Sequence, residues 1–411
     1  MSKNTPEIRI NGFEESWTPY LLKEICELIT VGIANSATHA YSDNGIVMFR
    51  NQNIKENHLD DSEVLYINEE FEKKYVNKRL KENDLLITRT GYPGIACVVP
   101  KKHENSQTFT TLIARVKDGI NPDFTCRYIN SNIGKRYFKA TQIGGGQKNS
   151  GAGILSEMPI KIPKSPDEQL KLVDLFTEID KIIFFHQQEY DKLVNNKKAM
   201  LEKMFPKEGC DVPEIRFKGF DEPWKQHKLS EIAMKVSEKN TDLFYIETFT
   251  NSAEFGIISQ RDFFDHDVAK LDKLGGYYVV RHEDFVYNPR ISNMAPVGPI
   301  NRNKLNKTGV MSPLYTVFRP YNINTTFLEY FFKGNYWHSY MYFNGDSGAR
   351  SDRFSIKDNI FFEMLIPVPH IEEQKKIGDY FEKLDSLISF HQQELEKLKN
   401  IKTALLEKMF V

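Results

Sequence analysis

The chain has 411 residues, of which 40% are hydrophobic and 27% are charged, and its formal net charge is −1. This length exceeds what a single core usually organises, so two domains or a repeated domain are expected. No apolar run reaches the roughly 20 residues that a membrane-spanning helix needs, and the composition is typical of a soluble globular protein. Length and composition therefore argue against a membrane protein.

The cysteines and the N-terminus indicate a cellular compartment. The first residues, "MSKNTPEIRINGF", contain no apolar leader, and the four cysteines form no Cys-x-x-Cys pair. We therefore expect a reduced, cytoplasmic protein without a cysteine metal site.

In chain order, the first half of the sequence returns in the second half. Each half has a lead-in, a strand after an acidic turn, a strand bounded by prolines and a long helix. By contrast, residues 35–155 and 240–355 share only scattered identities. This pattern predicts two similar mixed α/β domains that hold different contents, although neutral drift after an old duplication is the alternative. The repeated pairs are "PEIRINGFEESW" (6–17) with "PEIRFKGFDEPW" (213–224), "LKENDLLI" (80–87) with "VRHEDFVY" (280–287), and "MPIKIPKSPDEQ" (158–169) with "MLIPVPHIEEQ" (364–374).

Both long helices carry a heptad seam. Steps of four and three residues from Leu172 and from Ile377 meet apolar or aromatic side chains, except at one histidine and then one lysine in each series. We predict that the histidines, His186 and His391, fix the register of a coiled coil. Metal binding is the weaker alternative, because neither histidine has a second ligand four residues on.

An antiparallel pair of these helices would relate the two halves by an approximate two-fold axis. Duplex DNA has the same approximate symmetry, and half-sites one turn apart lie about 34 Å from each other. The helices therefore suggest a spacer between two DNA-reading domains.

The distribution of charge supports DNA better than the net charge does. Residues 124–156 and 285–328 contain no acidic residue but several cations, so a basic surface is expected in each half. From the second stretch we select Lys304 and Lys307 as DNA-binding candidates. The cations are Arg127, Lys135, Arg136, Lys139 and Lys148 in the first stretch, and Arg290, Arg302, Lys304, Lys307 and Arg319 in the second.

Two glycine-containing segments are candidates for loops that approach DNA. "GGGQKNSGAG" (144–153) lacks the Gly-Lys-Ser/Thr ending of a P-loop, so a plain loop remains the alternative to DNA contact. The candidate residues are Gln147, Lys148 and Asn149 in this loop, and Arg350 and Arg353 in its counterpart, residues 345–353.

The sequence contains no arrangement typical of a catalytic site. "NPRI" (288–291) is similar to the Asn-Pro-Pro-aromatic motif of amino-methyltransferases, but arginine and isoleucine replace its last two residues. We interpret Asn288 and Arg290 as part of a basic DNA-contacting loop. No nuclease motif or nucleotide-cofactor motif is present, so a binding subunit without cofactor or metal is expected.

Two aromatic-rich segments, 127–140 and 328–343, are predicted to be amphipathic helices. Their rings are expected in the core, with base stacking as the alternative.

Taken in order and in duplicate, these motifs resemble the DNA-specificity subunits of type I restriction-modification systems. The resemblance rests on the paired openings, on "NDLLITRTGYPGIACVV" (83–99), on "GARSDRFSIKDNIFFEMLIPVPHIEEQ" (348–374) and on the twin helices that end "LEKMF". It implies an α+β fold with a pseudo-two-fold internal repeat, in which an antiparallel coiled coil separates two target recognition domains. The implied domains are residues 1–163 and 207–369, and the implied spacer helices are residues 164–206 and 370–411.

The resemblance also implies the partners and the function. Such a subunit binds a bipartite site on double-stranded DNA and catalyses nothing itself. Two modification subunits, which use S-adenosylmethionine, methylate adenine there, and restriction subunits join through them. A specificity subunit of a related restriction-modification system, or a coiled-coil adaptor between proteins, are the alternatives.

Further candidates come from the loop "ITRTGYPG", which adds Thr88 and Arg89 to the DNA-binding residues. The second copy lacks this Thr-Arg-x-Gly pattern, so the equivalence of Arg89 and Arg290 stays open. The bases read are not predicted, since base contacts depend on docking geometry.

Overall fold

The computed structural model describes residues 4–141, 151–263, 271–346 and 352–411. The chain forms two compact units. Unit 1 contains Met1–Gln187 and Gln393–Val411, and unit 2 contains Gln188–Gln392. Each unit therefore combines a domain from one half of the sequence with the end of the long helix from the other half.

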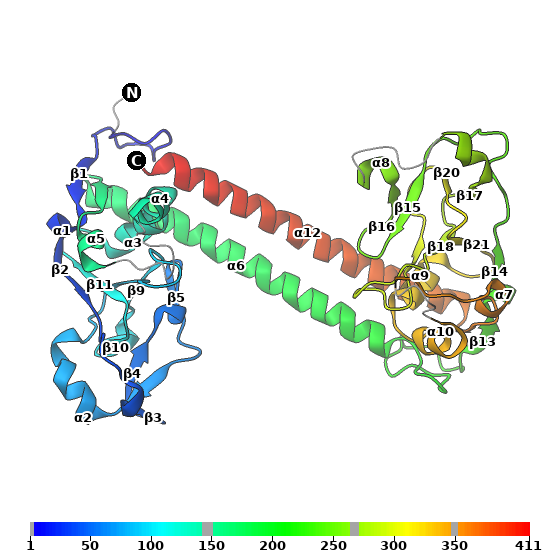
Figure 1. The fold of residues 1–411 in the computed structure, drawn as a ribbon, viewed down its shortest axis with the longest axis horizontal. Coiled ribbons are helices and arrows are strands. Elements are labelled where there is room, and N and C mark those ends of the chain that lie inside the picture. The colour runs from blue at the N-terminus through cyan, green and yellow to red at the C-terminus, as the bar shows by residue number, and fades with distance from the viewer. Residues whose placement is uncertain (1–3, 142–150, 264–270, 347–351) are drawn as a thin grey trace. The chain divides into compact units, whose positions relative to one another are not determined.

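Unit 1 is a mixed α/β domain (Figure 1). Its strands are β1 (Thr18–Leu21), β2 (Cys26–Val31), β3 (Tyr41–Ser42), β4 (Ile46–Phe49), β5 (Ile54–Lys55), β6 (His58–Leu59), β7 (Leu65–Ile67), β8 (Leu85–Ile87), β9 (Ala96–Val98), β10 (Gln107–Thr108), β11 (Leu112–Val116) and β12 (Pro159–Ile162). Its helices are α1 (Leu22–Ile25), α2 (Glu69–Glu72), α3 (Pro122–Asn130), α4 (Asn132–Thr141), α5 (Ala152–Ser156) and the start of α6 (Pro166–Lys203).

Unit 2 is also a mixed α/β domain (Figure 1). Its strands are β13 (Lys225–Lys228), β14 (Ala233–Lys235), β15 (Phe249–Ser252), β16 (Gly256–Ser259), β17 (Tyr278–Val280), β18 (Phe285–Tyr287), β19 (Ile300–Arg302), β20 (Gly309–Met311), β21 (Thr316–Pro320) and β22 (Leu365–Val368). Its helices are α7 (Leu229–Ile232), α8 (Gln260–Phe263), α9 (Thr325–Lys333), α10 (His338–Asn344), α11 (Asp358–Phe361) and the start of α12 (Ile371–Met409).

The two units repeat the same sheet. Its strand order is β2-β11-β8-β9 in unit 1 and β14-β21-β18-β19 in unit 2, with every neighbouring pair antiparallel. A separate antiparallel pair, β1–β12 or β13–β22, joins the lead-in to the strand before each long helix. The predicted internal repeat and the α+β class are confirmed.

The units differ in the strands outside this common sheet. Unit 1 has a second sheet of order β10-β4-β7-β3, whereas unit 2 has two separate pairs, β15–β16 and β17–β20. These strands lie in the parts of the sequence that share only scattered identities. The structure therefore varies where the sequence varies.

A conserved-looking turn precedes the central strand of each common sheet. Asn83 and Glu283 both have a left-handed backbone, with φ of 70° and 72°. The next residue, Asp84 in unit 1, is buried and accepts two hydrogen bonds, of 2.7 and 2.8 Å, from Arg115 on the neighbouring strand. Asp284 and Arg319 repeat this pair at the same two distances in unit 2. The acidic turn therefore pins β8 to β11 and β18 to β21.

Each aromatic-rich segment forms two helices, not the single helix that we expected. The first breaks between α3 and α4 at Ser131, whose hydroxyl donates to the Tyr128 carbonyl at 2.7 Å. Most of the rings are buried, as predicted, including Tyr128 and Phe138. Phe343 at the end of α10 is an exception, because it is 90% exposed.

The long helices run antiparallel within each unit. In unit 1, Phe176 of α6 contacts Phe410, and Asp180 of α6 pairs with Lys402 at 2.5 Å. Positions thus ascend along α6 as they descend along α12. In unit 2, Phe205 contacts Phe381 and Lys197 pairs with Asp385, which repeats this antiparallel order.

These ion pairs explain the lysines that interrupt the heptad seam. Lys402 and Lys197 are each only about a fifth exposed, and each meets an aspartate of the opposite helix. Asp385 also accepts a hydrogen bond of 2.7 Å from the hydroxyl of Tyr330 on α9. Burial raises the pKa of Asp385, but the hydrogen bonds from Lys197 and Tyr330 outweigh burial and hold that pKa below its usual value.

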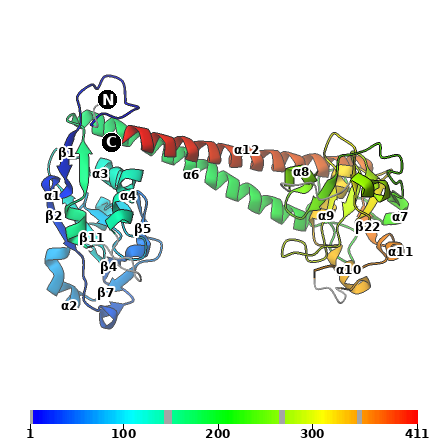
Figure 2. The same cartoon turned by 45° about the horizontal axis from the view of Figure 1, so that its top comes forward.

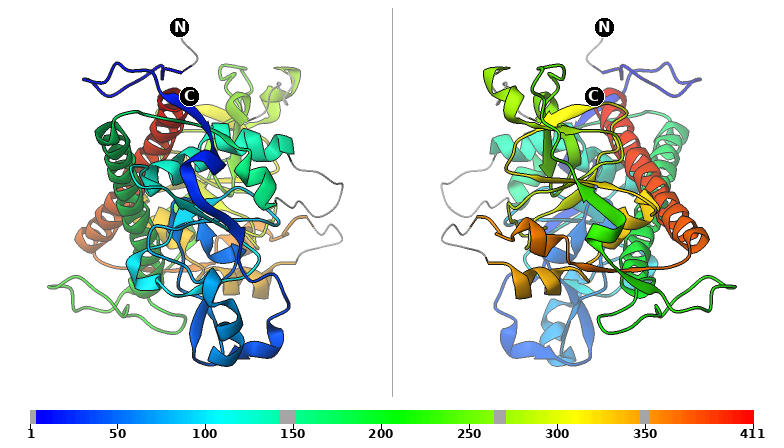
Figure 3. Two further views of the ribbon diagram at one scale, coloured as in Figure 1. Left: turned by 90° about the vertical axis from the view of Figure 1, so that its left-hand side faces the viewer. Right: turned by 90° about the vertical axis from the view of Figure 1, so that its right-hand side faces the viewer.

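The last residues of each long helix complete a domain core. Phe410 is 3% exposed, and the Val411 carbonyl accepts a hydrogen bond of 2.6 Å from Tyr128 on α3. Figure 2 and the left panel of Figure 3 show these helix ends along one side of unit 1, next to α3. The rings around Phe410 belong to Trp17, Phe124, Tyr128 and Phe176, and those around Phe205 in unit 2 belong to Trp224, Phe327, Phe331 and Phe381.

The lead-in is attached to the beginning of each long helix. Arg9 donates two hydrogen bonds, of 2.7 and 2.8 Å, to the buried carboxylate of Glu168, which also accepts one of 3.1 Å from the Trp17 indole. Arg216 and Glu373 repeat the bidentate pair in unit 2, at 2.8 Å for both bonds. This contact explains why the Pro-Glu-Ile-Arg opening is repeated. In the described residues, no helix is both long and apolar enough to span a membrane.

Replacing Phe410 by alanine is expected to destabilise unit 1 by about 3–5 kcal/mol, the usual cost of deleting a buried phenylalanine side chain. Phe205→Ala should cost about as much in unit 2. Chemical denaturation with unit-resolved hydrogen exchange would measure both. Phe343→Ala, at a site that is 90% exposed, is the matched control and should cost little. Equal effects of Phe343→Ala and Phe410→Ala would contradict this account.

Asp385→Asn is expected to reduce the free energy of unfolding of unit 2 at neutral pH by about 1–3 kcal/mol, since it removes a charged acceptor. Because the pKa of Asp385 is lowered on folding, its stabilisation is present above pH about 4 and is lost as the pH falls through the folded pKa. Wild type and variant should therefore converge in acid. Glu189→Gln, in the exposed pair with Lys192, is the control and should change stability by less than about 0.5 kcal/mol.

Candidate nucleic-acid interface

The loop after β8 is closed from within. The Thr88 hydroxyl donates to the Tyr92 carbonyl at 2.6 Å and accepts from the Ile95 N–H at 2.9 Å. Thr88 is itself only 4% exposed. This threonine therefore shapes the loop, and the side chains that point outward are those of its neighbours.

Arg89 lies beside a second arginine that the sequence analysis missed. The side-chain oxygen of Asn51 accepts from the Arg89 N–H at 2.9 Å, and the Asn51 amide donates to Thr90 at 2.9 Å. Asn51 follows Arg50 at the end of β4, so the ends of β4 and β8 are held together. Among the described residues, the Nε atoms of both Arg50 and Arg89 are buried without a hydrogen-bond partner. The only signal for Arg50 in the sequence was its place after an apolar strand.

In unit 2 the corresponding loop brings two candidate arginines together. Asn288 is buried; its amide donates to the Asn251 carbonyl at 2.8 Å and its oxygen accepts from the Arg290 N–H at 3.0 Å. Arg290 is exposed and forms an antiparallel backbone bridge with Arg353. The Nε atom of Arg353 is also buried without a partner among the described residues.

The paired strands settle how the two loops correspond. β8 ends at Ile87 and β18 ends at Tyr287, each after the same turn and buried aspartate. Thr88 therefore corresponds to Asn288, and Arg290 occupies the place of Thr90. Arg89 and Arg290 are neighbours in this scheme and not equivalents.

The acid-free stretch of the second half is not an uncompensated basic surface. Lys304 lies 3.3 Å from Glu329, and Lys307 lies 2.9 Å from Glu247. Arg302 is buried against Glu329 at 2.7 Å, and Arg319 pairs with Asp284. The expectation of a basic surface failed here because the neutralising carboxylates come from other parts of the chain.

The first half shows the same compensation. Arg127 pairs with Asp180 at 2.8 Å, and Lys135 pairs with Glu56 at 2.6 Å. The other candidates of the glycine-containing loops, Gln147, Lys148, Asn149 and Arg350, lie outside the described residues.

The two seam histidines are half-buried on the long helices. The ring of His186 lies 5.5 Å from that of Phe185, and the ring of His391 lies 5.3 Å from that of Phe390. Their role in the helix register stays a prediction. In the part of the chain that the structure describes, no group of three or more His, Cys, Asp or Glu side chains could hold a metal ion.

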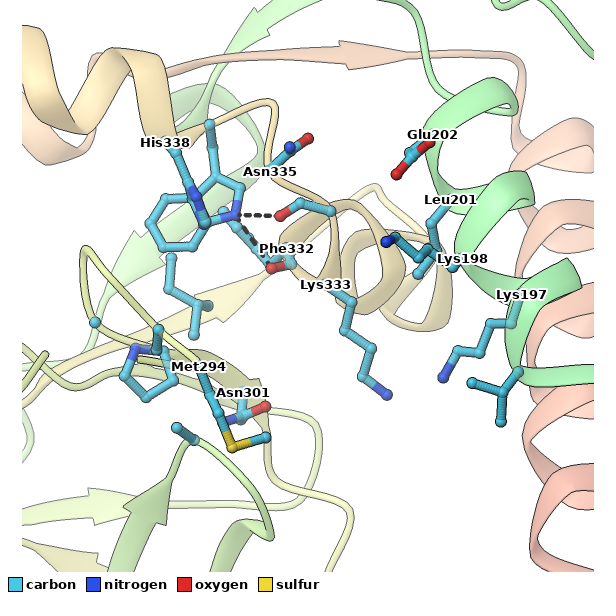
Figure 4. A pocket seen from close by; sticks show the side chains of 18 residues that line it. Lys197, Lys198, Leu201, Glu202, Met294, Asn301, Phe332, Lys333, Asn335 and His338 are labelled. Atoms are coloured by element: carbon cyan, nitrogen blue, oxygen red, sulfur yellow. Dashed lines mark hydrogen bonds between the residues drawn. The ribbon is translucent and has the colours of Figure 1, made fainter. Parts of the chain in front are cut away.

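Two cavities flank the β18–β19 loop in unit 2. One, of about 430 Å³, lies between this loop, α6 and the α9–α10 region, and Figure 4 shows Lys197 and Lys333 on its wall. Both lysines are already paired with carboxylates, Lys197 with Asp385 and Lys333 with Glu329. The other cavity, of about 350 Å³, lies beside Asn288 and Arg290.

A duplicated sheet that carries different loops is the architecture of a protein with two related binding domains. Residues 14–195 and 221–400 match the family model of the type I restriction modification DNA specificity domain, and the chain belongs to this family. It is a specificity subunit that directs target recognition in a restriction-modification complex and is not itself catalytic.

Similar proteins agree with this assignment. The type I restriction enzyme MjaVIII specificity subunit of Methanocaldococcus jannaschii is 24% identical over 350 residues, which cover 81% of this chain and 80% of that protein. The fold is similar to that of the S subunit of a type I restriction-modification system from M. genitalium, with a TM-score of 0.55, 13% identity and 99% of both chains covered. A chain from a structural study of the assembly of a type I R-M system has a TM-score of 0.53 and 16% identity, with 98% of this chain and 99% of that chain covered.

Arg290→Ala is expected to weaken binding of target DNA by roughly tenfold, within the range of about 1–3 kcal/mol for an arginine that contacts a base. Lys307→Ala is the matched control, because that lysine is engaged by Glu247, and its effect should be several-fold smaller. Titration of labelled duplex at fixed salt would measure both. A larger loss in Lys307→Ala would contradict this assignment.

Proposed function

We propose that this specificity subunit reads a bipartite site on double-stranded DNA, one part with each unit. The observation that carries the proposal is the common sheet, which presents a Thr-Arg loop in unit 1 and an Asn-Pro-Arg loop in unit 2. Two equal frames with unlike loops suit two unlike half-sites. Residues 1–163 and 207–369 would be the target recognition domains, and residues 164–206 and 370–411 the spacer helices.

The DNA contacts that we propose are centred on the arginines at the strand ends. These are Arg50 and Arg89 in unit 1 and Arg290 and Arg353 in unit 2. Three of them have a buried Nε without a partner among the described residues, and Arg290 is exposed. Guanidinium groups bind phosphates and guanine edges with paired hydrogen bonds, so unused donors favour such a ligand.

The catalytic steps would belong to other subunits. We propose that two modification subunits, which bind S-adenosylmethionine, dock on this chain and methylate adenine in the bipartite site, and that restriction subunits join through them. This chain would supply position and selectivity, since its binding energy decides which adenine reaches the methyltransferase.

Single-molecule sequencing of DNA would test the proposal in cells that express this chain with its modification subunit. We expect a new split motif with methyladenine on both strands, absent from cells that express the modification subunit alone. Unchanged methylation, with both proteins folded and associated, would contradict the proposal. Binding of the purified complex to a duplex with the motif should also weaken as salt rises, by about 0.9 in log K per log unit of salt for each phosphate neutralised.

A further inference from the structure

The cavity beside Arg290 in unit 2 is built mainly from polar side chains. It has a volume of about 350 Å³, within the range of pockets that hold small ligands. β15, the start of α8, the loop after β18 and the turn before β21 form its wall. The residues that matter for its chemistry are Asn251, Gln260, Asn288, Arg290 and Tyr315.

The two asparagines in the wall are used in building it. The Asn251 amide donates to the Val286 carbonyl at 2.7 Å, and its oxygen accepts from Asn301 at 2.7 Å. Asn288 is bonded to Asn251 and to the Arg290 N–H, as described above. These side chains therefore hold the cavity open and have little capacity left for a ligand.

Gln260 is different, because it keeps a buried acceptor unused. Its side chain is 9% exposed, and its amide nitrogen donates to the Phe249 carbonyl at 3.2 Å. A carbonyl can only accept, so this bond fixes which end of the amide faces away from Phe249. That end, Oε1, has no partner among the described residues. A buried carbonyl without a partner is costly, which points to a ligand that supplies a donor.

The donor identifies the chemistry of the ligand. Phosphate and sugar-linking oxygens cannot donate, whereas the exocyclic amino groups of adenine and cytosine donate from the major-groove edge. Arg290 at the rim of the cavity supplies a positive charge for the neighbouring backbone. We propose that this cavity receives the edge of an adenine or cytosine, whose amino group donates to Gln260 Oε1. The proposal rests on the DNA-reading function above and assigns Gln260 as a specificity-determining residue.

The test uses the full chain in its methylating complex, once sequencing has supplied the motif. Duplexes are made in which each adenine of the motif is replaced by purine, or each cytosine by 2-pyrimidinone, so that one exocyclic amino group is lost at a time. We expect one position, in one half-site, at which this loss weakens wild-type binding about tenfold. Purine at that position would identify adenine, and 2-pyrimidinone would identify cytosine.

Gln260→Met keeps the length of the side chain but removes the acceptor. This variant should bind the unmodified duplex about tenfold more weakly and show no further loss at the sensitive position. Gln226→Met, at an exposed glutamine on β13 of the same unit, is the control and should keep the wild-type pattern. If Gln260→Met keeps the full loss at every position, the proposal is wrong.

A second variant keeps the test decisive if Gln260→Met does not fold, as judged from its melting curve. Gln260→Glu retains an acceptor, so it should keep the discrimination at the sensitive position. Equal binding of all duplexes by Gln260→Glu would overturn the proposal. Failure of the proposed function looks different, because wild type would then produce no new methylated motif at all.

Discussion

The burial of one phenylalanine at the end of each long helix is the contact on which the rest of the structure depends. Phe410 lies among rings of α3 and α6 in unit 1, and Phe205 lies among the equivalent rings in unit 2. Each such ring contributes several kcal/mol when fully buried. Because the buried end comes from the other half of the sequence, neither domain has its full core until both helices are in place. The twice-written "LEKMF" is thus explained as a core element.

The ion pairs then select the antiparallel register that this burial requires. A lysine in a heptad seam is costly unless a carboxylate meets it, and Asp180 and Asp385 meet Lys402 and Lys197. A shift of the helices by one heptad would separate both pairs and withdraw both phenylalanines. The hydrophobic contact supplies the stability, and the ion pairs penalise the wrong alignments.

Local patterns in the sequence predicted much of this fold. The repeat, the long helices, the strands that end at Ile87 and Tyr287, and the proline-bounded strands depend on periodicity and turn chemistry, which are visible along the chain. The basic surface of the second half was predicted wrongly because charge compensation is not local. Glu247 and Glu329 neutralise lysines that follow or precede them by many residues. Arg50 and Gln260 were missed for the same reason, since only the folded chain shows that a buried atom lacks a partner.

The division between frame and loops has an energetic consequence. The common sheet is held by buried aspartate–arginine pairs and by cores that include the helix ends, and none of these groups lies in the loops after β8 and β18. Asn51 and Asn251 tie those loops to the frame mainly through backbone atoms, which are the same for any sequence. Side chains such as Arg89, Arg290 and Gln260 can therefore change without removing the contacts that stabilise the units. Changes in DNA preference would then cost little stability, which is the condition under which a duplicated domain can acquire two different targets.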